Sequence, residues 1–514
     1  MAIHVLEYLE NSCRVEPKKP AFIDIEGSLS YEEVRDRAKA IGTKIGKTFS
    51  RLRQPVMVFS DRDVASLVSF LGVVYSGNFY VPVDVHMPKA RIALFIETIQ
   101  PAFVICQRKE EALAKELAGD CRILLYEEAV EEEVQEEMLL ERRKEIIDTD
   151  PLYLIFTSGS TGTPKGVIKS QRSVLAFMEQ FLKITGIESA DVLGGQAPFD
   201  FDVSAKDIYA TLAAGATLVI LPKIYFSFPK KLMDCLITYK VTTLIWAVSA
   251  LSIVANHQAF RYRVPDTIKR VLFSGEVLPI AHLNYWRQYL PDTVFTNLYA
   301  PTEVTGNCTY YIVDRDFQED ETLPLGEPFP NVEVMVLDEQ GHRIKPGQTG
   351  EIYVRGAFLS MGYYDNEERT KGAFLQNPMQ NFYPELVYKT GDLAVRDDRG
   401  EYRFLSREDF QIKHNGHRIE LGEIETAAYG IEGIDSCACV YVKEKKKIYL
   451  FAKGKEMDQK KVFLGLKERI PKYMFPNKIV ILEEMPMSKN MKLDRQKLLF
   501  LAKEIEQEKR KMED

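Results

Sequence analysis

Short apolar runs alternate with longer amphipathic segments along most of the chain. The runs are rich in β-branched and aromatic residues, which favour buried strands, whereas residues 30–47 repeat their apolar positions at helical spacing. This alternation is typical of parallel strands joined by helical crossovers, so we predict an α/β fold. The clearest strand-like runs are residues 55–60, 102–107, 121–126 and 152–158.

The pattern changes from about residue 325. Residues 332–356, "VEVMVLDEQGHRIKPGQTGEIYVRG", consist of short strand-like runs separated by glycine turns. They predict a β-rich subdomain. Further along, residues 437–442 and 447–454 are strand-like, and a helix is expected from about Asp458 to Glu468.

We place a domain boundary at Arg407 to Asp409, between the β-rich stretch and this last α/β stretch. Residues 1–407 would form a large N-terminal domain of mixed, mostly parallel sheets with helices and a β-rich subdomain. Residues 408–514 would form a small α+β C-terminal domain.

Composition narrows the class of protein only slightly. The 514 residues include 46% hydrophobic and 28% charged residues, as in ordinary soluble globular proteins. A formal net charge of −8 argues against a nucleic-acid-binding surface. Seven scattered cysteines favour reduced thiols in a cytoplasmic protein. Neither a signal peptide nor an apolar run of about 18 residues is found, so we expect no membrane insertion.

Residues 153–167, "YLIFTSGSTGTPKGV", join a strand-like run to a flexible loop that ends in a lysine. Glycine lets backbone N–H groups converge on phosphate oxygens, and hydroxyls and Lys165 add further donors and charge. The spacing matches neither the Walker A loop nor the dinucleotide fingerprint, which leaves a mobile Ser/Gly hairpin as the alternative. The loop residues are Thr157, Ser158, Gly159, Ser160, Thr161, Gly162, Thr163 and Lys165.

This loop closely resembles the phosphate-loop signature of the acyl-adenylate-forming ligases. Four further motifs of that family follow in its order and extend the resemblance over about residues 5–500. The family implies a mobile C-terminal domain, with its hinge at Asp409. The further motifs are "NLYAPTEVT" (297–305), "YKTGDL" (388–393), "FLSREDFQIKHNGHRIELGEIE" (404–425) and "PMSKNMKLDRQKL" (486–498).

Within the family, residues 196–218, "QAPFDFDVSAKDIYATLAAGATL", resemble the F-D-x-S motif of amino-acid adenylation enzymes. Together with "VLFSGEVLP" (271–279), they look most like stand-alone D-alanine–carrier protein ligases. Adenylation domains of peptide synthetases share much of this pattern. We therefore keep open a stand-alone adenylation enzyme for another amino acid.

The resemblance implies two half-reactions. A carboxylate attacks the α-phosphate of ATP, and the acyl group then passes to the phosphopantetheine thiol of a carrier protein. The carrier is expected to be a separate protein, because no carrier segment follows Asp514. Charge builds up in the first step, so positive groups and donors must be placed in advance.

The same resemblance assigns catalytic and nucleotide-binding roles. Lys492 would bridge the substrate carboxylate and the α-phosphate, and its alternative is an ordinary surface lysine. Thr302 would meet the α-phosphate, and Glu303 would hold Mg²⁺. Tyr299 would offer a face to adenine. The ribose would be held by Asp392 and reached by Arg407, while the loop to Lys165 holds the β- and γ-phosphates.

Asp202 would hold the substrate's α-ammonium; the alternative is that it pairs with a nearby lysine such as Lys206. Trp246 would narrow the pocket and suit a small side chain. Lys206 argues against a small substrate side chain, because a cation in the pocket could pair with an acidic one. It could instead reach solvent or Asp207. The expected pocket residues are Asp202, Val203, Lys206, Trp246, Leu272, Ser274, Leu298, Gly306 and Asn307.

Three positions depart from the family pattern: Ala300, Met491 and Ser406 stand where glycine is usual. None removes a charged group, so we expect activity to be retained. An acyl- or aryl-CoA ligase is the first rival, but Asp202 would repel an acid that lacks an ammonium. A non-catalytic nucleotide-binding protein is the second. The joint presence of Lys165, Glu303, Asp392 and Lys492 argues against it.

Overall fold

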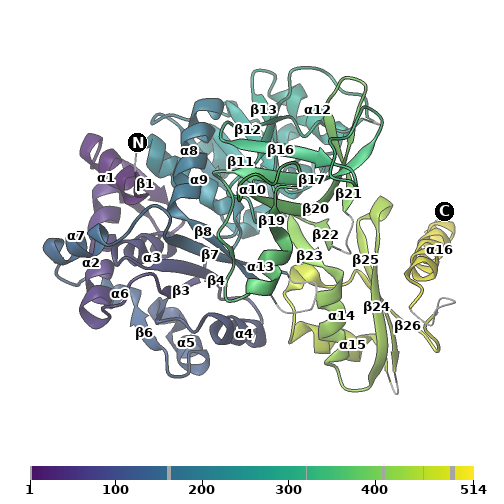
Figure 1. Cartoon of the computed structure of the whole chain (residues 1–514), viewed down its shortest axis with the longest axis horizontal. Coiled ribbons are helices and arrows are strands. Elements are labelled where there is room, and N and C mark those ends of the chain that lie inside the picture. The colour runs from purple at the N-terminus through teal and green to yellow at the C-terminus, as the bar shows by residue number, and fades with distance from the viewer. Residues whose placement is uncertain are drawn as a thin grey trace. The chain divides into compact units, whose positions relative to one another are not determined.

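The computed structural model describes residues 3–158, 164–319, 321–407, 411–454, 457–486 and 493–513, without the side chains of 406 and 508–513 (Figure 1). The chain divides into two compact units. The first unit comprises Met1–Val85, Thr98–Phe156 and Gly166–Glu408. The second comprises His86–Glu97, Thr157–Lys165 and Asp409–Asp514. None of the described helices is long and apolar enough to cross a membrane.

A seven-stranded sheet in the order β18-β8-β7-β4-β3-β5-β6 occupies the N-terminal part. Its strands β3 to β7 pair in parallel, as the strand-like runs predict. The strand β3 is buried throughout, as expected of a parallel strand covered on both faces. The strands are β3 (Pro55–Ser60), β4 (Phe79–Asp84), β5 (Phe103–Cys106), β6 (Arg122–Leu125), β7 (Pro151–Thr157), β8 (Lys165–Ser170) and β18 (Gly362–Tyr363).

A nine-stranded sheet follows in the order β15-β14-β13-β12-β11-β9-β10-β1-β2. The strands from β13 to β1 pair in parallel, and the edges are antiparallel. Its strands are β1 (Pro20–Ile23), β2 (Ser28–Ser30), β9 (Val192–Gly195), β10 (Thr217–Ile220), β11 (Thr243–Ala247), β12 (Arg270–Ser274), β13 (Val294–Tyr299), β14 (Thr309–Ile312) and β15 (Glu327–Pro328).

The predicted β-rich subdomain is a five-stranded antiparallel sheet, so this prediction is confirmed. Its central strand β20 pairs with three others, and Asp392 lies within it opposite Arg407. The sheet comprises β16 (Val332–Leu337), β17 (Thr349–Gly356), β19 (Phe374–Gln376), β20 (Leu386–Arg396) and β21 (Tyr402–Arg407).

Helices of the first unit cover both large sheets. The predicted helix at 30–47 is α2 (Tyr31–Thr48), which begins with a reciprocal capping box between Ser30 and Glu33. The other helices of eight or more residues in this unit are α1 (Leu6–Val15), α3 (Val64–Tyr75), α7 (Glu136–Lys144), α8 (Gln171–Thr185), α9 (Val203–Ala214), α10 (Pro229–Thr238), α11 (Val248–Asn256) and α12 (Ile280–Tyr289). Most of α4 (Lys89–Ile99) belongs to the second unit. Shorter helices are α5 (Glu111–Leu117), α6 (Tyr126–Ala129) and α13 (Glu367–Ala373).

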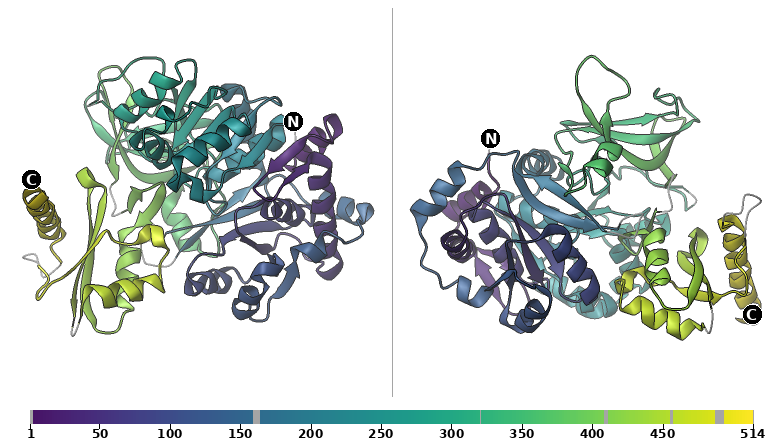
Figure 2. Two further views of the ribbon diagram at one scale, coloured as in Figure 1. Left: turned by 180° about the vertical axis from the view of Figure 1, so that it is seen from behind. Right: turned by 60° about the horizontal axis from the view of Figure 1, so that its bottom comes forward.

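The largest core cluster joins the two sheets through α8 and α9. It contains residues of both sheets, such as Tyr153 of β7 and Leu272 of β12, with Phe177 and Tyr209 from the helices between them. Helices α10 to α12 cover the other face of the nine-stranded sheet (Figure 2). A second core cluster lies beneath them. The core helix α9 therefore packs against both sheets, and its first turn is held firmly.

The second unit holds a three-stranded sheet of β24 (Ile434–Val442), β25 (Lys447–Gly454) and β26 (Lys478–Ile481). The predicted helix after residue 457 is α15 (Gln459–Lys467), capped by the Asp458 side chain. Cys437 and Cys439 are buried in one cluster. Also present are β22 (Gln411–His414), β23 (His417–Glu420), α14 (Leu421–Tyr429) and α16 (Arg495–Glu513).

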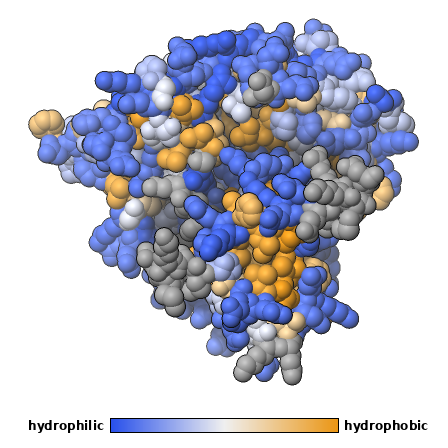
Figure 3. All heavy atoms as spheres, turned by 90° about the vertical axis from the view of Figure 1, so that its right-hand side faces the viewer, coloured by the Kyte–Doolittle hydropathy of each residue, from blue (hydrophilic) through white to orange (hydrophobic). Residues whose placement is uncertain are grey.

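Large apolar side chains also reach the surface of the second unit. Tyr429, Phe463, Leu464 and Phe500 are all exposed. Figure 3 shows that apolar residues gather on one face of the molecule beside hydrophilic ones.

Candidate active site

The nine-stranded sheet reverses its strand order at β9. The chain passes from β9 to β10 on one side, and then crosses to β11, β12 and β13 on the other. In open α/β sheets, ligands bind beyond the carboxyl ends of the strands at such a switch point. The segment after β9 leads directly to Asp202 at the start of α9. The residues with F-D-x-S spacing thus lie where the topology favours a ligand.

The Asp202 carboxylate is held by two groups from the seven-stranded sheet. The Tyr153 hydroxyl donates to its Oδ1 at 2.7 Å, and the Lys169 ammonium lies 3.6 Å from its Oδ2. Asp202 therefore pairs with Lys169, a residue on β8. The sequence alternative of an ion pair with a lysine is therefore met, but the lysine is Lys169 and not Lys206.

Lys169 is fully buried and serves more than one partner. Its ammonium donates to the Thr302 carbonyl and also lies in the field of Glu303. Burial lowers the pKa of Lys169, and the charges of Asp202 and Glu303 oppose that shift. One buried cation thus compensates two carboxylates that the sequence assigned to different roles.

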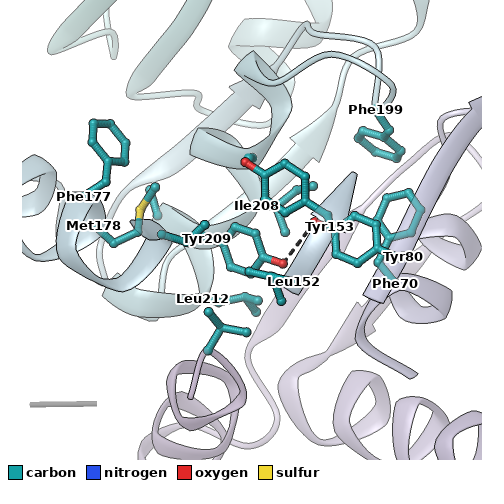
Figure 4. Packing of buried hydrophobic residues seen from close by; sticks show 14 of the residues in the cluster. Phe70, Tyr80, Leu152, Tyr153, Phe177, Met178, Phe199, Ile208, Tyr209 and Leu212 are labelled. Carbon is teal, nitrogen blue, oxygen red and sulfur yellow. Dashed lines mark hydrogen bonds between the residues drawn. The ribbon is translucent and has the colours of Figure 1, made fainter. Parts of the chain in front are cut away.

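A stack of aromatic rings positions Tyr153 (Figure 4). Tyr80 lies beside it in the neighbouring strand, with ring centroids 5.5 Å apart, and Phe70 stacks on Tyr80 at 4.5 Å. The hydroxyls of Tyr80 and Tyr209 are 3.0 Å apart and share a hydrogen bond. Burial, aided by the Asp202 charge, raises the pKa of Tyr153 well above its usual value. Tyr153 therefore stays protonated and donates to Asp202.

Lys206 lies one helical turn after Asp202, also buried, at 1% exposure. Its ammonium donates to Asn307 Oδ1 at 2.9 Å and to Ser274 Oγ at 3.3 Å. Burial lowers the pKa of Lys206 to about 8, opposed by the charges of Asp202 and Asp207. The structure therefore brings together three of the expected pocket residues and excludes the alternative that Lys206 reaches solvent.

The apolar pocket positions divide between the two faces of the sheet. Leu272 and Leu298 belong to the cluster that faces α9. Trp246 belongs to the opposite cluster, where its indole N–H donates to the Gly194 carbonyl at 2.7 Å. The prediction that Trp246 narrows the pocket is therefore wrong. Ile245, one position earlier, pairs with Leu272 in the register and shares its cluster.

Gly306 and Val203 complete the expected set. Gly306 has a positive φ of 67°, and a Cβ there would lie 2.3 Å from the Phe177 ring. Only glycine fits without displacement of the neighbouring Asn307. Val203 is the first residue of α9 and is half-buried.

A second polar cluster forms around Asp392, which is fully buried. The Tyr299 hydroxyl donates to its Oδ2 at 2.6 Å, and Arg407 donates to its Oδ1 at 2.5 Å. Arg407 also donates to the Thr390 carbonyl at 3.0 Å. These contacts join the three residues that the resemblance assigns to adenine and ribose.

Glu303 is also fully buried, and the Tyr363 hydroxyl donates to its carboxylate at 2.7 Å. The backbone of Glu303 is fixed as well, because its carbonyl accepts from the Ser360 N–H at 2.9 Å. Thr302, half-buried, precedes it and carries the carbonyl that binds Lys169. The carboxylate thus has one defined position next to the Asp202 cluster.

Only part of the phosphate loop lies within the described residues. Thr157 ends β7, Lys165 begins β8, and Ser158 donates to the Arg418 carbonyl at 2.9 Å. The loop residues Gly159, Ser160, Thr161, Gly162 and Thr163 lie outside the described residues, as do Lys492 and Asp409.

A match to a known protein family gives the context for the polar clusters around Asp202, Glu303 and Asp392. The family described as "AMP-binding enzyme" matches residues 9–364, well over half of the chain. The protein belongs to the AMP-binding enzyme family. The predicted resemblance is thereby confirmed, and the protein is an adenylate-forming ligase.

Curated relatives of this AMP-binding enzyme include carrier-protein ligases and peptide synthetases. A D-alanine--D-alanyl carrier protein ligase of Listeria innocua is 31% identical over 512 residues, covering 97% of this chain and 99% of that protein. Bacitracin synthase 1 of Bacillus licheniformis is 30% identical over 500 residues. That match covers 96% of this chain but only 9% of the much larger synthase.

Solved structures show the same fold. The Vibrio cholerae adenylation domain AlmE, solved in complex with glycyl-adenosine-5'-phosphate, superposes with a TM-score of 0.83. It is 19% identical, and the match covers 98% of both chains. The predicted fold, with large N-terminal and small C-terminal parts, is therefore confirmed for this AMP-binding enzyme.

Sequence reasoning missed Lys169, Tyr153, Tyr363 and Ile245 as members of these clusters. Lys169 left a signal, because a lysine in the strand-like run "GVIKS" falls at a buried position of β8. Lysine is rarely buried without a partner, so that position alone pointed to a nearby carboxylate. Tyrosines in buried strands, by contrast, resemble ordinary core residues.

Proposed function

We propose that this enzyme activates an amino acid with ATP and passes the aminoacyl group to the phosphopantetheine thiol of a separate carrier protein. In both half-reactions it would resemble the D-alanine–carrier protein ligases that match its whole length. The observation that carries the proposal is the half-buried Asp202 carboxylate at the strand-order switch of the nine-stranded sheet, held by Tyr153 and Lys169.

The charge of Asp202 favours an incoming cation. Lys169 and Lys206 contribute two positive charges, and Asp202 and Glu303 contribute two negative charges, so these four groups are balanced before a substrate enters. The Asp202 carboxylate would bind a substrate α-ammonium by its opposite charge. An acid without an ammonium would bring only a negative charge toward Asp202, and this repulsion argues against acyl-CoA ligase activity.

The cluster around Asp392 suits the nucleotide. Each carboxylate oxygen accepts one hydrogen bond, from Tyr299 or from Arg407, and each has a second lone pair for a ribose hydroxyl. Arg407 also neutralises the carboxylate, so a neutral sugar is a better ligand there than a cation. We assign this cluster to the ribose.

Glu303 fits a magnesium ion by its donor chemistry. A carboxylate oxygen is the ligand that Mg²⁺ prefers, and Mg²⁺ often takes one or two carboxylates together with substrate phosphates. When bound, the ion would neutralise phosphate charge during the displacement. Tyr363 would hold the carboxylate in place for it.

In the first half-reaction the substrate carboxylate oxygen would bond to the α-phosphorus, while the bond to pyrophosphate breaks. In the second, the carrier thiolate would bond to the acyl carbon and AMP would leave. Lys492 and the loop up to Lys165 would supply positive charge for the first step, as the family resemblance implies.

Amino-acid-dependent exchange of pyrophosphate into ATP tests this function. We expect exchange with at least one amino acid from a panel of D- and L-isomers. The isosteric variant Asp202→Asn should raise the KM for the amino acid at least ~100-fold and leave ATP binding nearly unchanged, because only the ammonium contact is lost. Absence of exchange with every amino acid would overturn the proposal.

A further inference from the structure

We propose that the activated amino acid carries a carboxylate on its side chain, and that the ammonium of Lys206 binds that carboxylate. This inference rests on the proposed amino-acid adenylation and names its substrate class. The substrate would be an acidic amino acid. Asp202 would bind its α-ammonium, and Lys206 would bind its side-chain carboxylate.

Lys206 is a buried cation whose described partners are both neutral. Its ammonium contacts an amide oxygen of Asn307 and the hydroxyl of Ser274. Among the residues that the structure describes, no carboxylate forms an ion pair with it. Lys169, which is equally buried, lies against Asp202. An ammonium held in a dry interior without a directly paired carboxylate is costly, unless a ligand supplies that carboxylate.

The neighbouring Asp207 acts on Lys206 through its charge but forms no ion pair with it among the described residues. Consecutive helical residues point in different directions, and Asp207 Oδ1 has no hydrogen-bond partner among the described residues. Burial raises the pKa of Asp207 to about 8, opposed by the charges of Lys206 and Arg62, so its charge is weakened near neutral pH. Lys206 therefore keeps its third N–H and its charge for another group.

The spacing of Asp202 and Lys206 matches an acidic amino acid. They lie four residues apart at the start of α9, so they share one face and are separated by roughly 6 Å along the axis. In glutamate, the α-nitrogen and the side-chain carboxyl carbon are four bonds apart, which spans roughly 5 Å when extended. The α-ammonium of the substrate can thus bind Asp202 while its side-chain carboxylate binds Lys206.

Ser274 and Asn307 complete a carboxylate-binding group. Because each accepts from Lys206 through its oxygen, the Ser274 hydroxyl hydrogen and the Asn307 amide hydrogens remain available as donors. Three donors from α9, the end of β12 and the segment after β13 therefore converge. Leu272, two residues before Ser274 on the same face of β12, is apolar and keeps water away. Such a dry setting strengthens a charge-assisted hydrogen bond.

Charge balance agrees with this assignment. Asp202 and Glu303 oppose Lys169 and Lys206, which sums to zero before the substrate enters. An acidic amino acid adds one ammonium and one side-chain carboxylate, and each meets a group of opposite sign. With alanine, the Lys206 charge would stay uncompensated beside a bound neutral side chain. The site would therefore favour an acidic amino acid over alanine, because alanine leaves the buried charge of Lys206 unpaired.

The test is pyrophosphate exchange by the unaltered enzyme with glutamate, glutamine, aspartate, asparagine and alanine, as both stereoisomers. Each acid and its amide have nearly the same shape, so their comparison isolates the charge. We expect kcat/KM for one acidic amino acid to exceed that for its amide by on the order of 100-fold or more. This comparison uses only the unaltered enzyme, so misfolding of a variant cannot affect its result.

Lys206→Met should remove that preference and bring the acid and its amide to within about tenfold of each other. Lys223→Met, at an exposed lysine before α10, is the matched control and should leave the preference intact. A thermal melt of each variant verifies folding. Exchange with alanine or an amide but with no acid would overturn the inference and leave the proposed function standing. Absence of exchange with any amino acid would overturn both.

Discussion

At the scale of single residues, Lys169 links the two halves of the site. It is buried between Asp202 and the segment that carries Glu303, and it binds the Thr302 carbonyl. The two carboxylates that we propose for the substrate ammonium and for Mg²⁺, Asp202 and Glu303, thus depend on one ammonium. Its role is to position both groups and to compensate their charge.

Lys169→Met is therefore expected to lower the free energy of unfolding by about 3 kcal/mol, because it leaves the buried Glu303 and the half-buried Asp202 without their cation. Urea unfolding measures this. Lys183→Met removes a lysine that is 62% exposed and paired with Glu179, and it should cost less than about 0.5 kcal/mol. Equal losses in the two variants would contradict the role assigned to Lys169.

The pKa of Lys206 gives a second prediction at this scale. Because burial lowers it to about 8, Lys206 is protonated at neutral pH and loses its charge as the pH rises through that value. The KM for an acidic substrate should therefore rise between about pH 7.5 and 9, and a bound carboxylate would move the midpoint upward. The Lys206→Met variant should lack this rise; a persisting rise would assign it to another group.

At the scale of elements, the site is built by α9 and by the ends of three parallel strands. Asn307 reaches Lys206 because Gly306 adopts a positive φ next to the Phe177 ring. The turn after β13 thus determines where the amide lies.

Gly306→Ala should lower the free energy of unfolding by about 2 kcal/mol, since its Cβ meets Phe177 in a backbone conformation that alanine disfavours. It should also raise the KM for the amino acid more than the KM for ATP, as exchange kinetics would show. In Gly372→Ala, the new methyl group meets nothing within 4 Å, so stability should hold or rise slightly. If Gly306→Ala were as stable and as active as this control, the turn after β13 would not determine where Asn307 lies.

The same elements show what could be predicted from sequence. The pattern of apolar and polar residues located α2 and α15 within one residue of their ends. The face of β11 could not be predicted, because a parallel strand buried on both sides has no alternation of polar and apolar residues. Trp246 and Ile245 are therefore indistinguishable until the pairing with β12 is known.

At the scale of the whole molecule, motif order assigns roles along most of the chain. Asp202, Glu303 and Asp392 belong to the first unit, whereas Lys492 follows Asp409 in the sequence and lies outside the described residues. The catalytic role of Lys492 therefore stays a prediction. Pairwise contacts such as Lys169 with Asp202 could not be predicted, because they join segments of unrelated sequence position.

Lys492→Ala should slow adenylate formation by roughly 100- to 1,000-fold, because one donor to the developing charge is lost. Nucleotide affinity should change little, since Asp392 and Arg407 are untouched. Pyrophosphate exchange measures the first quantity and calorimetric titration with ATP the second. A parallel loss of both would make Lys492 a nucleotide-binding residue and not a catalytic one.

The central claim is that Asp202 of this AMP-binding enzyme binds the α-ammonium of an amino-acid substrate. The most direct measurement compares pyrophosphate exchange for an amino acid and for the same acid without its amino group, such as glutamate and glutarate. We predict exchange with the amino acid and at least ~100-fold less with its deaminated analogue, a difference that Asp202→Asn removes. Equal exchange with both acids in the unaltered enzyme would contradict the account.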